Sequence, residues 1–196
     1  MKGLVVLHKK RWIHHDIKTQ NVLYNAKPFR LFLIDWGTSV PFRDVYSFTY
    51  RPWFSADNSN HPPEYKMYAH YKYGHKWKED FANEYANNRY IITLLKIQPQ
   101  YMTMLNDANT KLQSLFKNKG DKFLITIAPK ADVFAMGMIL AQMYLFVGIR
   151  HLYSTPIHSK MIHILKGMTH PDPTKRWTMR YSVQKLTPLI YQMCQK

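Results

Sequence analysis

The stretch from Ala131 to Ile149 places the strongest constraint on what this chain can fold into. It is apolar on nearly every side of a helix, and Pro129 lies just ahead of it, where helices often begin. A helix without a polar face must be surrounded by other protein or by lipid. Asp132 and Gln142 would both be costly in hydrocarbon. We therefore predict a buried helix at about 131–146, at the centre of the domain, and no membrane span.

Composition limits the class of protein. The chain has 196 residues, of which 46% are hydrophobic and 15% aromatic, so it is long enough for one packed core. Its formal net charge of +16 should attract phosphorylated, nucleic-acid or acidic protein partners. Charge alone does not choose among them.

Two further features bear on the compartment. Cys194 is the only cysteine, which excludes an internal disulfide framework and a cysteine-rich zinc site. Lys9, Lys10 and Arg11 interrupt the opening apolar residues before a cleavage-like segment appears. We expect an intracellular protein, in the cytoplasm.

Two short apolar runs, 22–24 and 31–34, flank the turn-forming residues 25–28 and predict a β-hairpin. Asn21 enters the first strand and Asp35 leaves the second. The hairpin should therefore bring an amide and a carboxylate together at one end.

Most of the remaining chain is predicted to be helical. Residues 79–117 show helical spacing with a break near Pro99, which suggests two helices. Residues 158–166 and 182–193 are amphipathic and are joined by the turn-rich segment 170–173. The segment 37–63 is irregular, and a loop of this length usually serves function. The fold class is therefore mainly α with one small hairpin.

Polar residues suited to phosphoryl transfer lie at the hairpin. Such transfer needs a carboxylate that orients the attacking hydroxyl and oxygen ligands that hold magnesium on the phosphates. Asp16-x-Lys18-x-x-Asn21 comes just before the first strand, and Asp35-Trp36-Gly37 follows the second. An isolated Asp-x-Lys is usually a solvated surface, but these four polar residues at this spacing form a candidate site.

The run His14-His15-Asp16-Ile17-Lys18-Thr19-Gln20-Asn21 and the triplet at 35–37 resemble the catalytic loop and metal motif of eukaryotic-type protein kinases. The resemblance implies that Asp16 is the catalytic base and that Lys18 neutralises the transferred phosphoryl group. It implies that Asn21 and Asp35 hold Mg²⁺ and that Leu23 lies under the adenine ring of ATP.

Later segments match the same family in order. Residues 62–64 (Pro-Pro-Glu) resemble the end of an activation segment, which would span 35–64. Asp132 begins a run that resembles the central buried helix, whose aspartate braces the catalytic loop. Arg176 ends a run, 172–176, that resembles the late motif whose arginine pairs with Glu64. These three residues are expected to be structural.

The resemblance implies a serine/threonine kinase, because Lys18 follows the base by two residues, and a fold like the kinase C-terminal lobe. A helical insertion is implied at about 79–125. The family's glycine-rich loop and β lobe do not precede the catalytic loop here, so the chain is a piece of a longer product, receives that lobe from elsewhere, or is no longer catalytic. His15 replaces the usual arginine, so we do not expect a phosphate-switched activation loop.

Trp36 is similar to the tryptophan of the casein-kinase-2-like subgroup, and residues 50–55 with the insertion resemble divergent kinases of large DNA viruses. The alternative function is an inactive kinase-derived module that binds protein or nucleic acid through the basic aromatic stretch 65–78. Amphipathic packing of that stretch is the favoured reading. The histidine spacing does not support a zinc site. The substrate is expected to be a protein, and an acidic one suits the charge.

Overall fold

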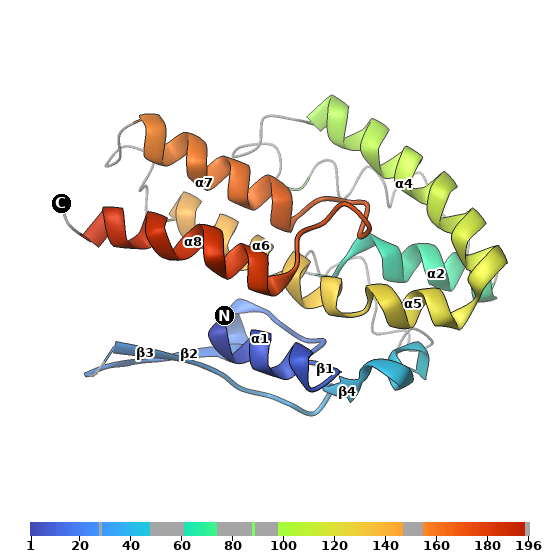
Figure 1. Cartoon of the computed structure of the whole chain (residues 1–196), viewed down its shortest axis with the longest axis horizontal. Coiled ribbons are helices and arrows are strands. Elements are labelled where there is room, and N and C mark those ends of the chain that lie inside the picture. Colours follow the sequence, from blue (N-terminus) through green and yellow to red (C-terminus); the bar gives the residue numbers. More distant parts are fainter. Residues whose placement is uncertain (28, 48–60, 74–87, 89–97, 147–154, 195–196) are drawn as a thin grey trace.

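The computed structural model describes residues 1–27, 29–47, 61–73, 88, 98–146 and 155–194 (Figure 1). Helices make up most of this part of the chain, and its strands form two two-stranded sheets, which confirms the mainly helical class. In chain order the elements are α1 (Lys2–Lys9), β1 (Trp12–Ile13), η1 (Thr19–Asn21), β2 (Val22–Ala26), β3 (Phe29–Leu33), β4 (Val40–Pro41), η2 (Phe42–Ser47), α2 (Pro63–Tyr73), α4 (Gln98–Lys119), α5 (Asp121–Ile127), α6 (Pro129–Phe146), α7 (Thr155–Met168) and α8 (Met179–Cys194).

Helix α6 lies at the centre because it packs on two sides. Phe134 and Met138 belong to a hydrophobic cluster that also takes residues from α2, α4 and α5. Val133, Met136 and Ile139 belong to a second cluster, built with α1, α7 and α8. A helix that contributes to both clusters needs apolar residues all round, which is the pattern that its sequence shows.

Gly137 allows α6 to approach the end of α7 closely. A Cβ atom at this position would lie 2.8 Å from Cγ2 of Thr169 and 2.9 Å from Cβ of Met168, which is closer than real Cβ atoms come. The absence of a side chain at Gly137 therefore sets the spacing between the two helices.

No single helix of the described residues is both long and apolar enough to cross a membrane. Helices α5 and α6 meet the length and composition criteria only as a pair, which is bent by 43° between them. Within the fold, α6 is largely buried by protein.

The hairpin forms as predicted and lies along one side of the helical body (Figure 1). Strands β2 and β3 are antiparallel, with Val22 opposite Leu33 and Ala26 opposite Phe29. Val22 and Leu33 pack against the second cluster, so the base of the hairpin is fixed to the core. This places the residues just outside the two strands next to each other.

One expectation about the chain path needs correction. The segment 37–63 is not irregular throughout, because β4 pairs with β1 and η2 follows it. Val40 and Val45 are buried there, and apolar contacts this short leave little periodic signal. Helix α4 begins at Gln98, at the break predicted near Pro99, and Pro99 lies in its first turn, where proline needs no N–H partner. The other helix predicted from 79–117, and residues 48–60, lie outside the described residues.

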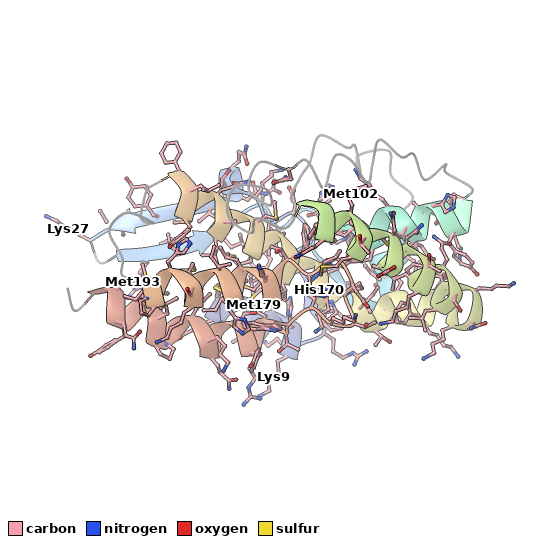
Figure 2. The ribbon with its side chains drawn as sticks, turned by 90° about the horizontal axis from the view of Figure 1, so that it is seen from above. Lys9, Lys27, Met102, His170, Met179 and Met193 are labelled. Carbon is pink, nitrogen blue, oxygen red and sulfur yellow. The ribbon has the colours of Figure 1, made fainter. Side chains whose placement is uncertain are left out.

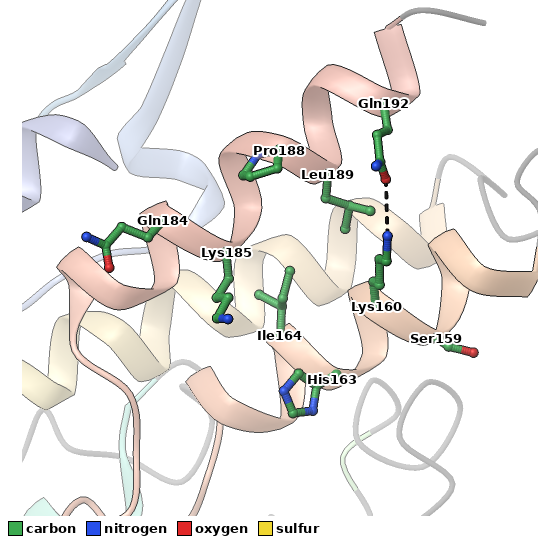
Figure 3. A pocket seen from close by; sticks show the side chains of 9 residues that line it. All are labelled: Ser159, Lys160, His163, Ile164, Gln184, Lys185, Pro188, Leu189 and Gln192. Atoms are coloured by element: carbon green, nitrogen blue, oxygen red, sulfur yellow. Dashed lines mark hydrogen bonds between the residues drawn. The ribbon is translucent and has the colours of Figure 1, made fainter.

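Helices α7 and α8 are packed side by side (Figure 3). Ile164 and Leu189 point between them, and the ammonium of Lys160 donates to Oε1 of Gln192 at 3.4 Å. Pro188 and Lys185 also line the cavity of about 550 Å³ that the two helices enclose. This cavity is far in sequence from the predicted site residues.

The predicted pair between Glu64 and Arg176 is present and fully buried. The guanidinium donates to both carboxylate oxygens, at 2.6 and 2.8 Å, so the contact is bidentate. Arg176 also donates to the carbonyl oxygens of His170 and Lys130, at 2.8 and 2.9 Å. The pair ties the start of α2 to the segment between α7 and α8.

Loss of one member of this buried pair should destabilise the fold strongly. Glu64→Gln leaves the guanidinium of Arg176 without a counter-charge, so we expect the free energy of unfolding to fall by about 3 kcal/mol. Lys72→Gln removes one member of the exposed Lys72–Asp121 pair, and we expect a loss below about 1 kcal/mol. Urea unfolding followed by circular dichroism measures both. Equal losses would show that the buried pair contributes no more than a surface pair.

Candidate active site

The carboxylate of Asp132 holds the loop that carries the candidate base. It accepts hydrogen bonds from the backbone amides of His14 and His15, at 2.9 and 3.0 Å. Nε2 of His8 lies 2.9 Å from the same carboxylate, which is 1% exposed. Burial raises the pKa of Asp132, but the hydrogen bonds from His8 and the two amides outweigh burial and lower it. The predicted brace is therefore present as a charged acceptor inside the core.

The backbone next to the candidate residues adopts uncommon conformations. His15 has a φ of 74° and Asp35 a φ of 61°, both in the left-handed region that non-glycine residues seldom enter. His15 is held there by the hydrogen bond from its backbone amide to Asp132. Its ring also packs against that of Tyr65, with 5.0 Å between the ring centres. Conformations of this kind persist where the surroundings fix them, and they cluster at active sites.

Asp16, Lys18 and Asn21 lie together as the sequence predicted. The ammonium of Lys18 donates to Oδ2 of Asp16 at 2.6 Å. Nδ2 of Asn21 donates to the same oxygen at 3.0 Å and to the backbone oxygen of Asp16 at 2.9 Å. The Asp16 side chain is 15% exposed, so it faces solvent over a small area while two donors fix its orientation.

The hairpin brings Asp35 to the same end as Asn21. The amide of Ile34 donates to the backbone oxygen of Asn21 at 2.9 Å, one step beyond the pair of Val22 and Leu33. The Asp35 side chain is exposed, and its Oδ1 accepts from the amide of Gly37 at a long 3.4 Å. An exposed carboxylate thus stands beside the strand that Asn21 enters.

His14 lies among the carboxylates of the site. One ring nitrogen, Nε2, is 3.1 Å from the backbone oxygen of Ile34. Burial lowers the pKa of His14, while the carboxylates of Asp132, Asp16 and Asp35 act in the opposite direction. His14 therefore stays mainly neutral and supports the loop without adding positive charge.

The donor set at the hairpin suits magnesium better than zinc. Because the Asn21 amide nitrogen donates to Asp16, the Asn21 carbonyl oxygen remains as an acceptor, and Asp35 supplies an exposed carboxylate. Mg²⁺ is usually held by one or two protein oxygens with phosphate and water. No group of three or more histidine, cysteine, aspartate or glutamate side chains is placed to hold a metal within the described residues.

Leu23 is on β2 opposite Phe32, and the side chains are 52% and 48% exposed. Trp36, which is 49% exposed, lies 4.6 Å from the His14 ring, and its Nε1 donates to Leu33. This open apolar face adjoins Asp35.

Several supporting residues were missed from the sequence. His8 meets Asp132 across 124 positions, and no local pattern signals such a contact. The hydroxyls of Thr38 and Ser39 each donate to the backbone oxygen of His14 at 3.2 Å. His61 lies close enough to Asp16 for the carboxylate to affect its pKa, which burial lowers to about 4. Of these residues, only Thr38 and Ser39 could have been suspected from the sequence, because they directly follow the triplet 35–37.

The basic aromatic stretch 65–78 behaves as a packed helix over its described part. Tyr65, Met67 and Tyr68 of α2 are buried, and Lys72 pairs with Asp121. The rings of Tyr65 and Tyr68 therefore belong to the core, whereas Tyr71 is 36% exposed. Residues 74–78 lie outside the described residues.

Comparison with known proteins gives one short similarity. A probable casein kinase I homolog of Encephalitozoon cuniculi is 38% identical over 45 residues. The matched stretch covers 23% of this chain and only 15% of that protein. No family model matches the chain, and no solved structure matches it. The similarity points to a relationship with kinases and goes no further.

The site predicts a loss of stability in acid. Burial lowers the pKa of His15 to about 4, below the ordinary value of about 6.5 in an unfolded chain. The unfolded state therefore binds a proton first, and the free energy of unfolding should fall as the pH drops from about 6.5 to about 4. His15→Asn keeps a residue that tolerates left-handed backbone and removes the titration.

Urea unfolding at pH 7, 6, 5 and 4 measures this effect. We expect the fall in the variant to be smaller than in the wild type by up to about 3 kcal/mol. The same fall in both proteins would show that His15 is not held neutral by its burial.

Proposed function

We propose that this chain carries the phosphoryl-transfer site of a serine/threonine protein kinase that uses ATP and Mg²⁺. The observation that carries the proposal is the Asp16 carboxylate, oriented by Lys18 and Asn21 on a loop braced from the core. Such a carboxylate at a partly exposed position suits a group that must meet a substrate hydroxyl.

Asp16 would act as the catalytic base. One carboxylate oxygen, Oδ2, already accepts from Lys18 and Asn21, which leaves Oδ1 to accept the hydrogen of a serine or threonine hydroxyl. As the hydroxyl oxygen bonds to the γ-phosphorus of ATP, its proton passes to Asp16 and the bond to ADP breaks. The two donors keep the carboxylate from turning away during this step.

Lys18 would neutralise the transferred phosphoryl group. Its ammonium is 2.6 Å from Asp16, so a phosphate that meets the base also meets this cation. Asn21 and Asp35 would hold Mg²⁺, which supplies positive charge that balances the phosphates of ATP. Leu23, on the open face of the hairpin, would contact the adenine ring.

The substrate is proposed to be a protein, and an acidic segment would suit the net charge of +16. We propose that the activation segment spans 35–64 and ends at Glu64, which Arg176 fixes. His15 is neutral at ordinary pH, because burial lowers its pKa to about 4. A neutral His15 would not attract a phosphate group on this segment, so we do not propose control by its phosphorylation.

Transfer of labelled phosphate from ATP to serine and threonine peptides, with Mg²⁺, tests the proposal. Asp16→Asn should lower the rate about 10²- to 10⁴-fold, the usual contribution of a positioned base. Asp107→Asn is a matched control, since Asp107 is an exposed carboxylate on α4. Both variants lose one negative charge, but only the first loses the base.

ATP binding separates the enzyme from the alternative, a kinase-derived module without activity. The intact chain should bind ATP in the presence of Mg²⁺, and Asp35→Ala should weaken that binding by about tenfold or more. If wild type and variant bind equally poorly and neither transfers phosphate, the chain is not a kinase by itself. The binding-module function would then be preferred.

A further inference from the structure

A cavity of about 620 Å³ lies between α1, α6 and α8, and none of the candidate catalytic or metal residues lines it. We call it the α1–α6–α8 cavity. Its walls include the apolar side chains of Val5, Phe42 and Met179, which come from α1, η2 and α8. The cavity is thus open to a ligand with an apolar part, and His8, whose ring contacts Asp132, also lines it.

Three basic residues line this cavity. Lys9, Lys130 and Arg180 line it, although they come from elements far apart in the chain. Lys9 extends outward from the edge of the molecule (Figure 2). No aspartate or glutamate is among the residues that line the cavity. Three positive charges at one cavity, with no carboxylate in its wall, attract anions.

The nearby carboxylates are already committed elsewhere. Asp132, two positions after Lys130, accepts from His8 and two backbone amides. Glu64 forms its bidentate pair with Arg176. Over the described ranges, neither Lys9 nor Arg180 has an ion-pair partner within 4.0 Å. The cavity wall therefore offers positive charge with no carboxylate in direct contact.

Lys130 is the half-buried member of the three basic residues. Its ammonium donates to the backbone oxygen of Arg176, which fixes its position at the cavity wall. Burial, and then the neighbouring guanidinium of Arg176, lower the pKa of Lys130 to about 8. A bound anion would favour the charged form of this lysine.

The cavity between α7 and α8 provides a comparison, because its two lysines each contact another side chain. Lys160 donates to Gln192, and the ammonium of Lys185 lies 5.2 Å above the ring of Tyr181 (Figure 3). Both lysines line that cavity. The two cavities are similar in volume and in number of lysines, so the second serves as a control.

We propose that the α1–α6–α8 cavity binds an organic phosphate. The phosphate group would contact Lys9, Lys130 and Arg180, and its apolar body would rest on the walls formed by Phe42 and Met179. A phosphate monoester carries nearly two negative charges at neutral pH and three acceptor oxygens, which match this set of donors. The ligand is either a free small molecule or a phosphorylated side chain of another protein.

Calorimetric titration of the intact chain with phenyl phosphate tests the proposal. We expect saturable binding that Lys9→Gln with Arg180→Gln weakens by about tenfold or more. Lys160→Gln with Lys185→Gln removes the same charge from the control cavity and should change the affinity little. Both pairs of substitutions are on helix surfaces, so the fold should be retained.

Three results would overturn the proposal. The first is that phenyl phosphate does not bind saturably, and the second is that the two double variants weaken its binding equally. The third is that inorganic phosphate binds as tightly as phenyl phosphate. Equal weakening would indicate a general attraction of anions to a basic protein. Should a variant fail to fold, methyl signals of Val5 and Met179 in the wild type decide the matter, since phenyl phosphate must shift them.

A second titration distinguishes the two sources of the phosphate. A short uncharged peptide that carries one phosphotyrosine is compared with phenyl phosphate and with the unphosphorylated peptide. Tighter binding of the phosphopeptide supports a phosphorylated protein partner. Binding of phenyl phosphate that is equal or tighter supports a small molecule. Either outcome retains the organic phosphate as the ligand.

Discussion

The carboxylate of Asp132 connects the core of this protein to its candidate chemistry. It is carried by the central helix α6, which contributes to both hydrophobic clusters. It accepts hydrogen bonds from the backbone amides of His14 and His15. Two amides that would otherwise be buried without an acceptor are thereby satisfied. The loop that follows is fixed by the interior, so Asp16 can face solvent without depending on surface contacts for its position.

The rest of the site is arranged around this fixed loop. Lys18 and Asn21 orient the Asp16 carboxylate, while the hairpin sets Asp35 next to Asn21 through the bond from Ile34. The backbone at His15 and Asp35 adopts uncommon conformations, and the amide of His15 is held by its hydrogen bond to Asp132. A rigid constellation of this kind favours reactions in which positioning supplies most of the catalysis, as in phosphoryl transfer.

Sequence reasoning reached the parts of this arrangement that are local. The spacing of Asp16, Lys18 and Asn21 and the hairpin could be predicted because short-range patterns encode them. The bond between His8 and Asp132 joins residues 124 positions apart, and packing alone creates it. The strand β4 was missed because two residues carry no periodicity. The basic cavity could not be predicted for the same reason as the His8–Asp132 contact. Its residues Lys9, Lys130 and Arg180 are far apart in sequence and come together only in the folded chain.

Hydrogen exchange at the amides of His14 and His15 tests the central claim most directly. If Asp132 holds the loop from the core, both amides should exchange only through global unfolding, with protection equal to that of buried amides in α6. The same protection should be present without any nucleotide. Exchange at the rate of an exposed loop, in a chain whose α6 amides stay protected, would contradict the account.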